Sequence, residues 1–186
     1  VTRRRNVTIA LGPSSNRMNA DSIQTAAVIG AGTMGHGVAQ VLAMAGIQTR
    51  LFDIDQDGIE RGLSRVAANL DKGVARGKVS EHSAAAAKAL LTGTTDMSVA
   101  IEGADVVIEA VPEIMELKKK IFTQLGDALG PNVLLATNTS SLPISEIASA
   151  AKYPERVTGM HFFNPVHIMK LVEVVKTPDS SEEAIA

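Results

Sequence analysis

The sequence predicts a doubly wound α/β fold with a mostly parallel β-sheet. Short apolar runs typical of buried strands alternate with helix-like segments from Ile23 onward, which favours parallel pairing through right-handed crossovers. A glycine-rich turn joins the first of these runs to the first helix-like segment. The length of 186 residues, with 45% hydrophobic and 20% charged residues, suits one globular domain.

In the first half, strands are predicted over residues 25–29 and 47–52. The first helix, over 34–45, has no internal breaker and ends before Gly46, which suits the C′ position. The second helix, over 56–76, carries apolar residues at helical spacing from Ile59 to Leu70. Ser80 is a suitable N-cap for a third helix that runs to Leu90.

In the second half, strands are predicted over 105–109, 133–136, 157–162 and 170–175, the last of them antiparallel. A helix over 116–129 ends before Pro131, and a short helix within 141–150 has Pro143 near its start. The stretch from Thr177 to the end is typical of an N-cap and the first turn of another helix.

The two ends of the chain are interpreted separately from the predicted domain over residues 22–178. Residues 1–21 form a predicted flexible extension, because residues 1–20 hold four arginines and no acid. Such a leader fits a transit peptide. We favour the alternative that it is a tag remnant, a linker or the product of an upstream non-Met start, with Met18 as the natural start. Residues 179–186 are expected to begin the linker to a helical domain that is absent from this chain.

Composition excludes several classes of function. The 18 basic and 20 acidic residues give a net charge of −2, so there is no electrostatic reason to expect nucleic-acid binding. Without cysteine there is no disulfide, thiol nucleophile or thiolate zinc site. No apolar run approaches the ~18 residues of a membrane span. We therefore expect a soluble protein, in the cytoplasm rather than the mitochondrion.

The glycine turn is the first candidate site and predicts a Rossmann-type nucleotide-binding domain. Its sequence, Gly30-Ala31-Gly32-Thr33-Met34-Gly35, matches G-x-G-x-x-G between a strand and a helix. Asp53 ends the second strand, where a carboxylate binds the ribose diol and favours NAD over NADP. FAD stays possible on this motif alone. The alternative is a turn that binds nothing, with Asp53 capping the next helix.

The second candidate site is an imidazole–carboxylate pair. If the last two strands form an antiparallel hairpin centred near His167, His161 faces Glu173 across it. A carboxylate on one ring nitrogen leaves the other free to act as acid or base. The alternative is a structural histidine in a salt bridge. We predict no metal, because His36, His82 and His167 lack ligand spacing.

Three segments together resemble the NAD-binding domain of the L-3-hydroxyacyl-CoA dehydrogenases, a family that includes the 3-hydroxybutyryl-CoA dehydrogenases. They are the Gly30–Gly35 turn, Asn138-Thr-Ser-Ser141, and His161-Phe-Phe-Asn-Pro165 with Met169-Lys-Leu-Val-Glu173. The resemblance implies that His161 is the catalytic base, that Glu173 orients it, and that Ser140 contacts both substrate and nicotinamide.

The resemblance also implies further contacts. The strand-end segment 109–113, which ends at Glu113, would lie along the cofactor, as would Lys118 and Asn164. Asn69 and Arg76 would hold coenzyme A, although some relatives carry a hydroxyl at the position of Asn69. Arg76 is equally well explained as an exposed charge at a helix end.

The implied reaction interconverts a (3S)-3-hydroxyacyl thioester and the 3-ketoacyl thioester, with NAD as the hydride carrier. Members of the family have a C-terminal helical domain that closes over the substrate and carries most of a homodimer interface, so we expect this chain alone to be weakly active or inactive. Three rival interpretations stay open: a non-catalytic NAD-binding module, a dehydrogenase of small free hydroxy acids, and a fragment of a larger fatty-acid oxidation protein fused to a hydratase.

Overall fold

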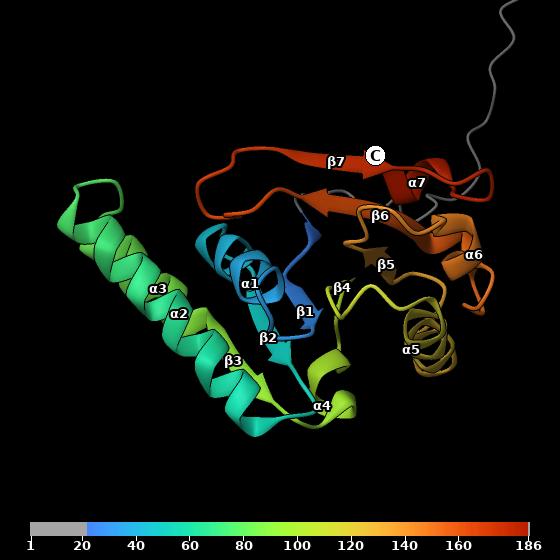
Figure 1. The fold of residues 1–186 in the computed structure, drawn as a ribbon, viewed down its shortest axis with the longest axis horizontal. Helices are drawn as coiled ribbons and strands as arrows, with labels where there is room; N and C mark the ends of the chain where they lie inside the picture. Colours follow the sequence, from blue (N-terminus) through green and yellow to red (C-terminus); the bar gives the residue numbers. More distant parts are fainter. Residues whose placement is uncertain (1–21, 186) are drawn as a thin grey trace, which may run out of the picture.

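A computed structural model of the protein describes residues 22–185. The predicted extension over residues 1–21 lies outside that range. A seven-stranded sheet forms the centre, with the strands in the order β3-β2-β1-β4-β5-β6-β7 (Figure 1). The strands are β1 (Thr25–Ile29), β2 (Gln48–Phe52), β3 (Leu91–Thr94), β4 (Val106–Glu109), β5 (Leu134–Thr137), β6 (Val157–Phe162) and β7 (Val172–Val175).

Seven α-helices and one 3₁₀ helix connect or follow these strands within the described range. They are α1 (Gly35–Met44), α2 (Gln56–Ala75), α3 (Glu81–Leu90), α4 (Met97–Ile101), α5 (Met115–Ala128), α6 (Ile144–Ala148), the 3₁₀ helix η2 (Pro154–Arg156) and α7 (Glu182–Ile185). The six strands β1 to β6 pair in parallel, and β7 pairs antiparallel with β6. The predicted fold class, including the antiparallel last strand, is therefore confirmed.

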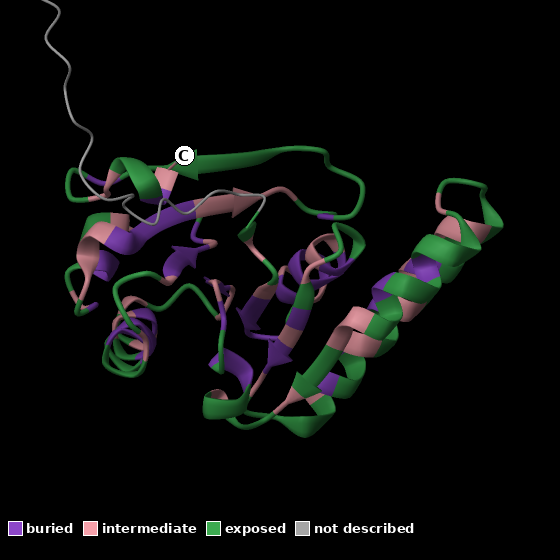
Figure 2. Cartoon of the chain, turned by 180° about the vertical axis from the view of Figure 1, so that it is seen from behind, coloured by how far each residue is buried: buried purple, intermediate pink, exposed green. Residues whose placement is uncertain are grey.

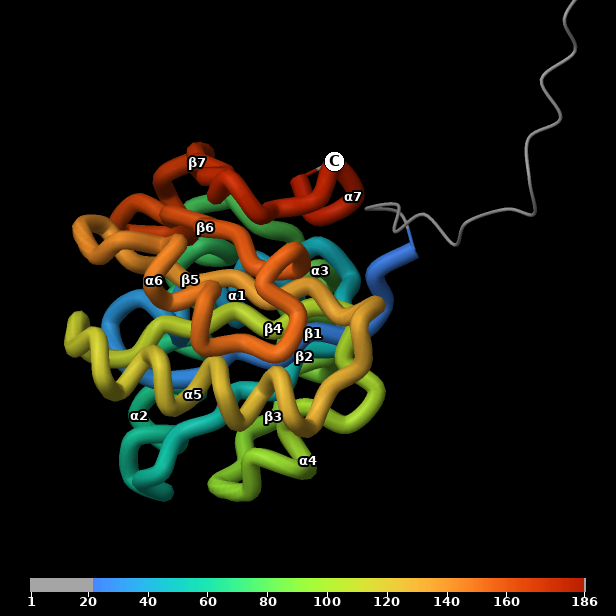
Figure 3. Tube along the Cα trace, turned by 90° about the vertical axis from the view of Figure 1, so that its right-hand side faces the viewer, coloured from blue at the N-terminus to red at the C-terminus, as the bar shows by residue number. Residues whose placement is uncertain are grey.

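Both faces of the central strands are buried, which explains their unbroken apolar sequences. Ala27 and Ile29 of β1 point into the core on the side of α4, α5 and α6. Ala26 and Val28 point into the opposite core, against α1. Figure 3 shows the strands stacked from β7 to β3, with α5 and α6 on the near side. The sheet thus lies between two helical layers.

Helices α2 and α3 form an antiparallel pair that projects to one side of the sheet (Figure 1). A small cluster packs the middle of this pair against α1 through Ala43, Val66, Leu70, Ala84 and Ala87. The predicted cap is present, since Ser80 Oγ accepts a hydrogen bond from Ser83 N. Toward its tip the pair is largely exposed (Figure 2).

Besides the three-residue 3₁₀ helix η2, the sequence analysis missed two elements. The edge strand β3 has the sequence Leu-Thr-Gly-Thr, which contains no apolar run, and its pairing with β2 supplies what local sequence does not. Helix α4 is only five residues long, too short to show a helical period, and it begins after the N-cap Asp96. Strand β7 also starts at Val172, two residues later than the prediction.

The last described residues form α7, in agreement with the predicted helical turn. Ser181 Oγ accepts a hydrogen bond from Ala184 N, and Ala184 is buried against the core on the α1 side. No helix among residues 22–185 is long and apolar enough to cross a membrane.

Two of the three glycines of the first turn, Gly32 and Gly35, make a matched test of this packing. A Cβ on Gly35 would lie 1.7 Å from Gly30 O, whereas a Cβ on Gly32 would meet nothing within 4 Å. We expect Gly35→Ala to lower the free energy of unfolding by about 1–3 kcal/mol, because backbone must shift to relieve the overlap. Gly32→Ala should change it by less than about 0.5 kcal/mol. Chemical denaturation of both variants measures this, and equal destabilisation would contradict it.

Candidate active site

A cavity of about 350 Å³ lies at the carboxyl-terminal edge of the parallel strands. This is the edge at which open α/β sheets bind ligands. The lining residues come from the β1–α1 turn, the segments after β4 and β5, and the end of β6. They are Met34, Ala110, Val111, Glu113, Asn138, Ser140, His161, Phe162, Phe163 and Asn164. Five predicted site residues, namely Met34, Glu113, Ser140, His161 and Asn164, are thereby brought together.

The predicted imidazole–carboxylate pair is present. His161 on β6 faces Glu173 on β7 in the register of the antiparallel pair. The Nδ1 atom of His161 lies 2.9 Å from Glu173 Oε2, and because an ionised carboxylate only accepts hydrogen bonds, Nδ1 carries the proton. The other ring nitrogen, Nε2, has no hydrogen-bond partner among residues 22–185 and is free for chemistry.

Neighbouring groups hold His161 in place. Asn138 Oδ1, from the loop after β5, accepts a hydrogen bond of 2.9 Å from Phe162 N and so ties that loop to the end of β6. The ring of Phe163 lies 4.6 Å from the His161 ring, centroid to centroid. The imidazole side chain is 25% exposed and that of Glu173 is 55% exposed, so the pair is open to solvent and to a ligand.

Glu113 reaches from the loop after β4 to the loop after β5. Its Oε1 accepts hydrogen bonds from Thr139 Oγ1 at 2.5 Å and from Ser140 N at 2.9 Å. Partial burial acts to raise the pKa of Glu113, but these two hydrogen bonds and the Lys118 ammonium group outweigh it, so the pKa lies below its ordinary value. Glu113 is therefore ionised at neutral pH. Glu113 binds the backbone N–H of Ser140, and the Ser140 hydroxyl group makes no hydrogen bond to another described residue.

Lys118 is placed deeper than its predicted role suggests. Its side chain is 1% exposed, and Nζ lies 2.7 Å and 2.9 Å from the two carboxylate oxygens of Glu109 and 3.1 Å from Glu113 Oε2. An ammonium group has three protons to donate, and these contacts occupy them. A direct contact between Lys118 and the cofactor stays a prediction.

The glycine turn and Asp53 lie side by side at the ends of β1 and β2. Asp53 Oδ2 accepts a hydrogen bond of 2.8 Å from Ala31 N, which holds the turn against β2. The N-cap of α2 is Asp55 and not Asp53, so the capping alternative for Asp53 does not apply. Helix α1 has no side-chain cap and no acid in its first turn, and Gly32 and Thr33 before it are exposed.

The two predicted coenzyme A residues do not line the cavity. Asn69 Nδ2 donates a hydrogen bond of 3.1 Å to Gln40 Oε1, a contact between α2 and α1. Arg76 is the C-cap of α2 and lies, exposed, at the tip of the projecting helical pair. Their contact with coenzyme A stays a prediction.

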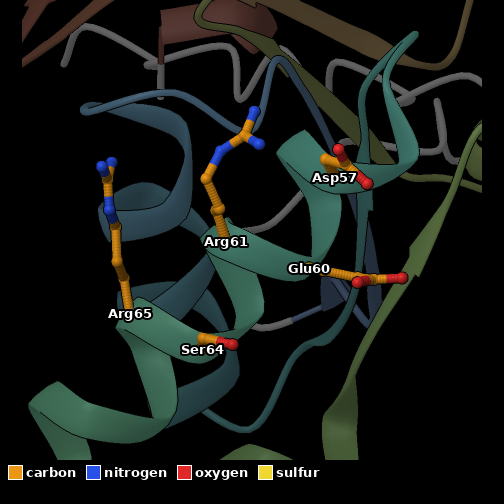
Figure 4. Close-up of a pocket in the computed structure, with 5 residues that line it drawn as sticks. All are labelled: Asp57, Glu60, Arg61, Ser64 and Arg65. Carbon is orange, nitrogen blue, oxygen red and sulfur yellow. The ribbon is translucent and has the colours of Figure 1, made fainter.

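A second hollow, of about 470 Å³, lies on the exposed surface of α2 and contains none of the predicted site residues. Its side chains are those of Asp57, Glu60, Arg61, Ser64 and Arg65 (Figure 4). The ion pair beside it, Arg61 with Asp55 at 3.1 Å, is more than half exposed and contributes about 1 kcal/mol or less. The cavity at the strand ends is therefore the candidate active site.

Sequence analysis missed the supporting roles of Glu109, Thr137 and Asn138. Asn138 directly follows β5, and the rule that ligands bind at the carboxyl ends of parallel strands could have marked it. The pairing of Glu109 with Lys118 has no local signal, because it depends on how α5 packs on β4. Residues 22–185 contain no cluster of three or more histidine and acidic side chains that could hold a metal ion.

Comparison with known proteins agrees with this geometry. Residues 25–186 match the family model for "3-hydroxyacyl-CoA dehydrogenase, NAD binding domain". The chain is 44% identical over 164 residues to a 3-hydroxyadipyl-CoA dehydrogenase of Escherichia coli, covering 88% of this chain and 34% of that protein. It is 43% identical over 167 residues to a 3-hydroxybutyryl-CoA dehydrogenase of Mycobacterium tuberculosis, covering 89% and 58%.

Solved structures show the same likeness. The crystal structure of (S)-3-hydroxybutyryl-CoA dehydrogenase from Ralstonia eutropha has a TM-score of 0.84 and 39% identity, covering 88% of this chain and 57% of that one. The chain thus spans between about a third and three fifths of these relatives. The match to the family model nevertheless extends over almost all of its described residues, and this chain belongs to the family of 3-hydroxyacyl-CoA dehydrogenase NAD-binding domains.

Proposed function

We propose that this chain is the NAD-binding and base-supplying part of an enzyme that interconverts (3S)-3-hydroxyacyl-CoA and 3-ketoacyl-CoA. The observation that carries the proposal is the His161–Glu173 pair, whose imidazole lines the cavity at the strand ends. A non-catalytic nucleotide-binding domain has no need of an oriented base with a free ring nitrogen. The names of the relatives support a thioester as the substrate class.

NAD is the cofactor of this domain family, and the residues at the edge of the sheet fit it. The uncapped N-terminus of α1 suits the diphosphate, because its free N–H groups and its dipole favour an anion. The open space beside Gly32 allows close approach of that group to the backbone. Asp53 would bind the adenosine ribose, and Met34, Ser140 and Asn164 would border the nicotinamide end. When bound, NAD supplies a hydride acceptor.

The protein residues then have distinct tasks. His161 Nε2 takes the proton of the substrate hydroxyl group, and Glu173 holds the ring through Nδ1 and balances the charge that the imidazole gains. Ser140 offers a hydroxyl group to the substrate from the opposite loop. Asn138, through its bond to Phe162 N, keeps the two sides of the cavity in register.

The substrate and base are tested together by NADH formation from (S)-3-hydroxybutyryl-CoA and NAD⁺ in the intact protein. We expect turnover with the thioester and little with free 3-hydroxybutyrate, and we expect His161→Ala to lower kcat by about 10²–10⁴-fold. His82→Ala, on the exposed surface of α3, is the matched control and should be unaffected. Equal turnover of the free acid would favour the hydroxy-acid alternative, and wild-type rates in His161→Ala would reject the proposal.

The role of Glu173 predicts a particular kinetic effect. Glu173→Gln keeps the shape of the side chain but loses the charge that stabilises the imidazolium, so kcat should fall by about 10–100-fold. The Kd for NAD⁺ should change by less than about twofold, because the lost interaction strengthens only as the proton is transferred. Steady-state kinetics and titration calorimetry measure the two effects, and a loss of affinity without a loss of kcat would contradict this role.

Asp53 should determine the preference for NAD over NADP. Asp53→Asn keeps an oxygen to accept the hydrogen bond from Ala31 N but removes the charge that repels a 2′-phosphate. We expect the ratio of the Kd for NADP⁺ to that for NAD⁺ to fall by about tenfold or more. Asp71→Asn, the same change at an exposed position of α2, should leave the ratio unchanged.

A further inference from the structure

A cluster of three charged groups lies beside the candidate active site and has an unbalanced charge. It contains the carboxylates of Glu109 and Glu113 and the single ammonium group of Lys118. With both carboxylates ionised, the cluster carries a net charge of −1. Glu109 and Lys118 are almost fully buried, and only Glu113 reaches the cavity.

Both carboxylate oxygens of Glu109 accept hydrogen bonds within this part of the structure. Its Oε1 accepts hydrogen bonds from Val111 N and Lys118 Nζ, both at 2.7 Å, and its Oε2 accepts from Thr137 Oγ1 at 2.7 Å and from Lys118 Nζ at 2.9 Å. Burial of a charge is tolerated only with such compensation. Glu109 thus fixes the position of the Lys118 ammonium group next to Glu113. Because Lys118 is shared between the two carboxylates, it neutralises Glu113 only in part.

The cavity adds no positive charge to offset the cluster. Its lining contains no lysine or arginine, and Glu113 is the only carboxylate residue among the lining side chains. The remaining nearby acid is Glu173, which contacts the imidazole of His161. The Glu113 side chain is 36% exposed, so water reduces the effect of its charge, but at contact distance the charge still acts on a ligand in the cavity.

We propose that this cluster sets the relative affinity of the domain for the oxidised and reduced forms of NAD, with Glu109 and Lys118 as positioning residues that act through Glu113. The inference rests on the proposed function, which puts the nicotinamide ring in this cavity. That ring carries a positive charge in NAD⁺ and none in NADH. A net negative site therefore favours the oxidised form and weakens retention of the reduced form.

Glu109 is essential to this account although it cannot touch the cofactor. If Glu109 lost its charge, Lys118 would neutralise Glu113 alone, and the net charge of the cluster would rise from −1 to zero. Removal of the charge on Glu113 has the same result. Two substitutions at different depths therefore predict a shift in the same direction, which is not expected of residues that only support the fold.

The test is the Kd for NAD⁺ and for NADH, each measured by titration calorimetry on the intact protein at neutral pH. We expect Glu113→Gln to raise the ratio of the Kd for NAD⁺ to the Kd for NADH by about five- to tenfold, and Glu109→Gln to raise it by at least about twofold. Glu113→Asp keeps the charge and should hold the ratio close to that of the unmodified protein. Glu116→Gln, which neutralises an exposed acid on α5, is the matched control.

The outcomes separate the two proposals. Binding of both cofactors with the same ratio in Glu113→Gln as in the unmodified protein overturns this inference and leaves the proposed function intact. Binding of neither cofactor by the unmodified protein overturns both. If Glu109→Gln does not fold, the comparison of Glu113→Gln with Glu113→Asp decides alone, because Glu113 is partly exposed and its replacement leaves the Glu109–Lys118 pair in place.

Discussion

Parallel pairing makes β1 to β6 end at one edge of the sheet, and the candidate active site depends on this constraint. Gly30, Asp53 and Asn138 directly follow β1, β2 and β5. Glu109 is the last residue of β4, and His161 is the second-last residue of β6. Residues that follow or end these strands, such as Met34 and His161, thus line one cavity although they lie more than a hundred positions apart. The single reversal, at β7, returns the chain along β6 and brings Glu173 opposite His161, so one antiparallel pairing completes what the parallel strands begin.

The two acid–base pairs of the site differ in burial, and this difference suits different tasks. The His161–Glu173 pair is partly exposed, so the imidazole can meet a substrate and exchange a proton. The Glu109–Lys118 pair is excluded from water, where the loss of hydration offsets much of the attraction between the charges. Such a pair is better explained by the orientation it imposes than by stability. It holds Glu113, which in turn holds the Thr139–Ser140 segment at the cavity.

Much of the fold and the central pair of the site could be predicted from local patterns. Buried parallel strands need apolar residues on both faces, and runs such as Thr25–Ile29 and Asp105–Glu109 meet that need. The facing of His161 and Glu173 followed from counting residues about the centre of a hairpin, because register in a hairpin is a local property. Strand β3 escaped prediction because its residues gain strand structure from the neighbouring β2 and not from their own preferences.

By itself, the sequence determined the fold class, the glycine turn with Asp53, and the His161–Glu173 pair, since each is encoded by residues close together or at a countable spacing. Only the tertiary structure decided that Lys118 is buried between Glu109 and Glu113, and that Asn138 joins the β5 loop to β6. These contacts join separate crossover units, and their geometry depends on how α5 and the strands pack. No periodicity in the chain records that packing, because it is a property of the assembled core.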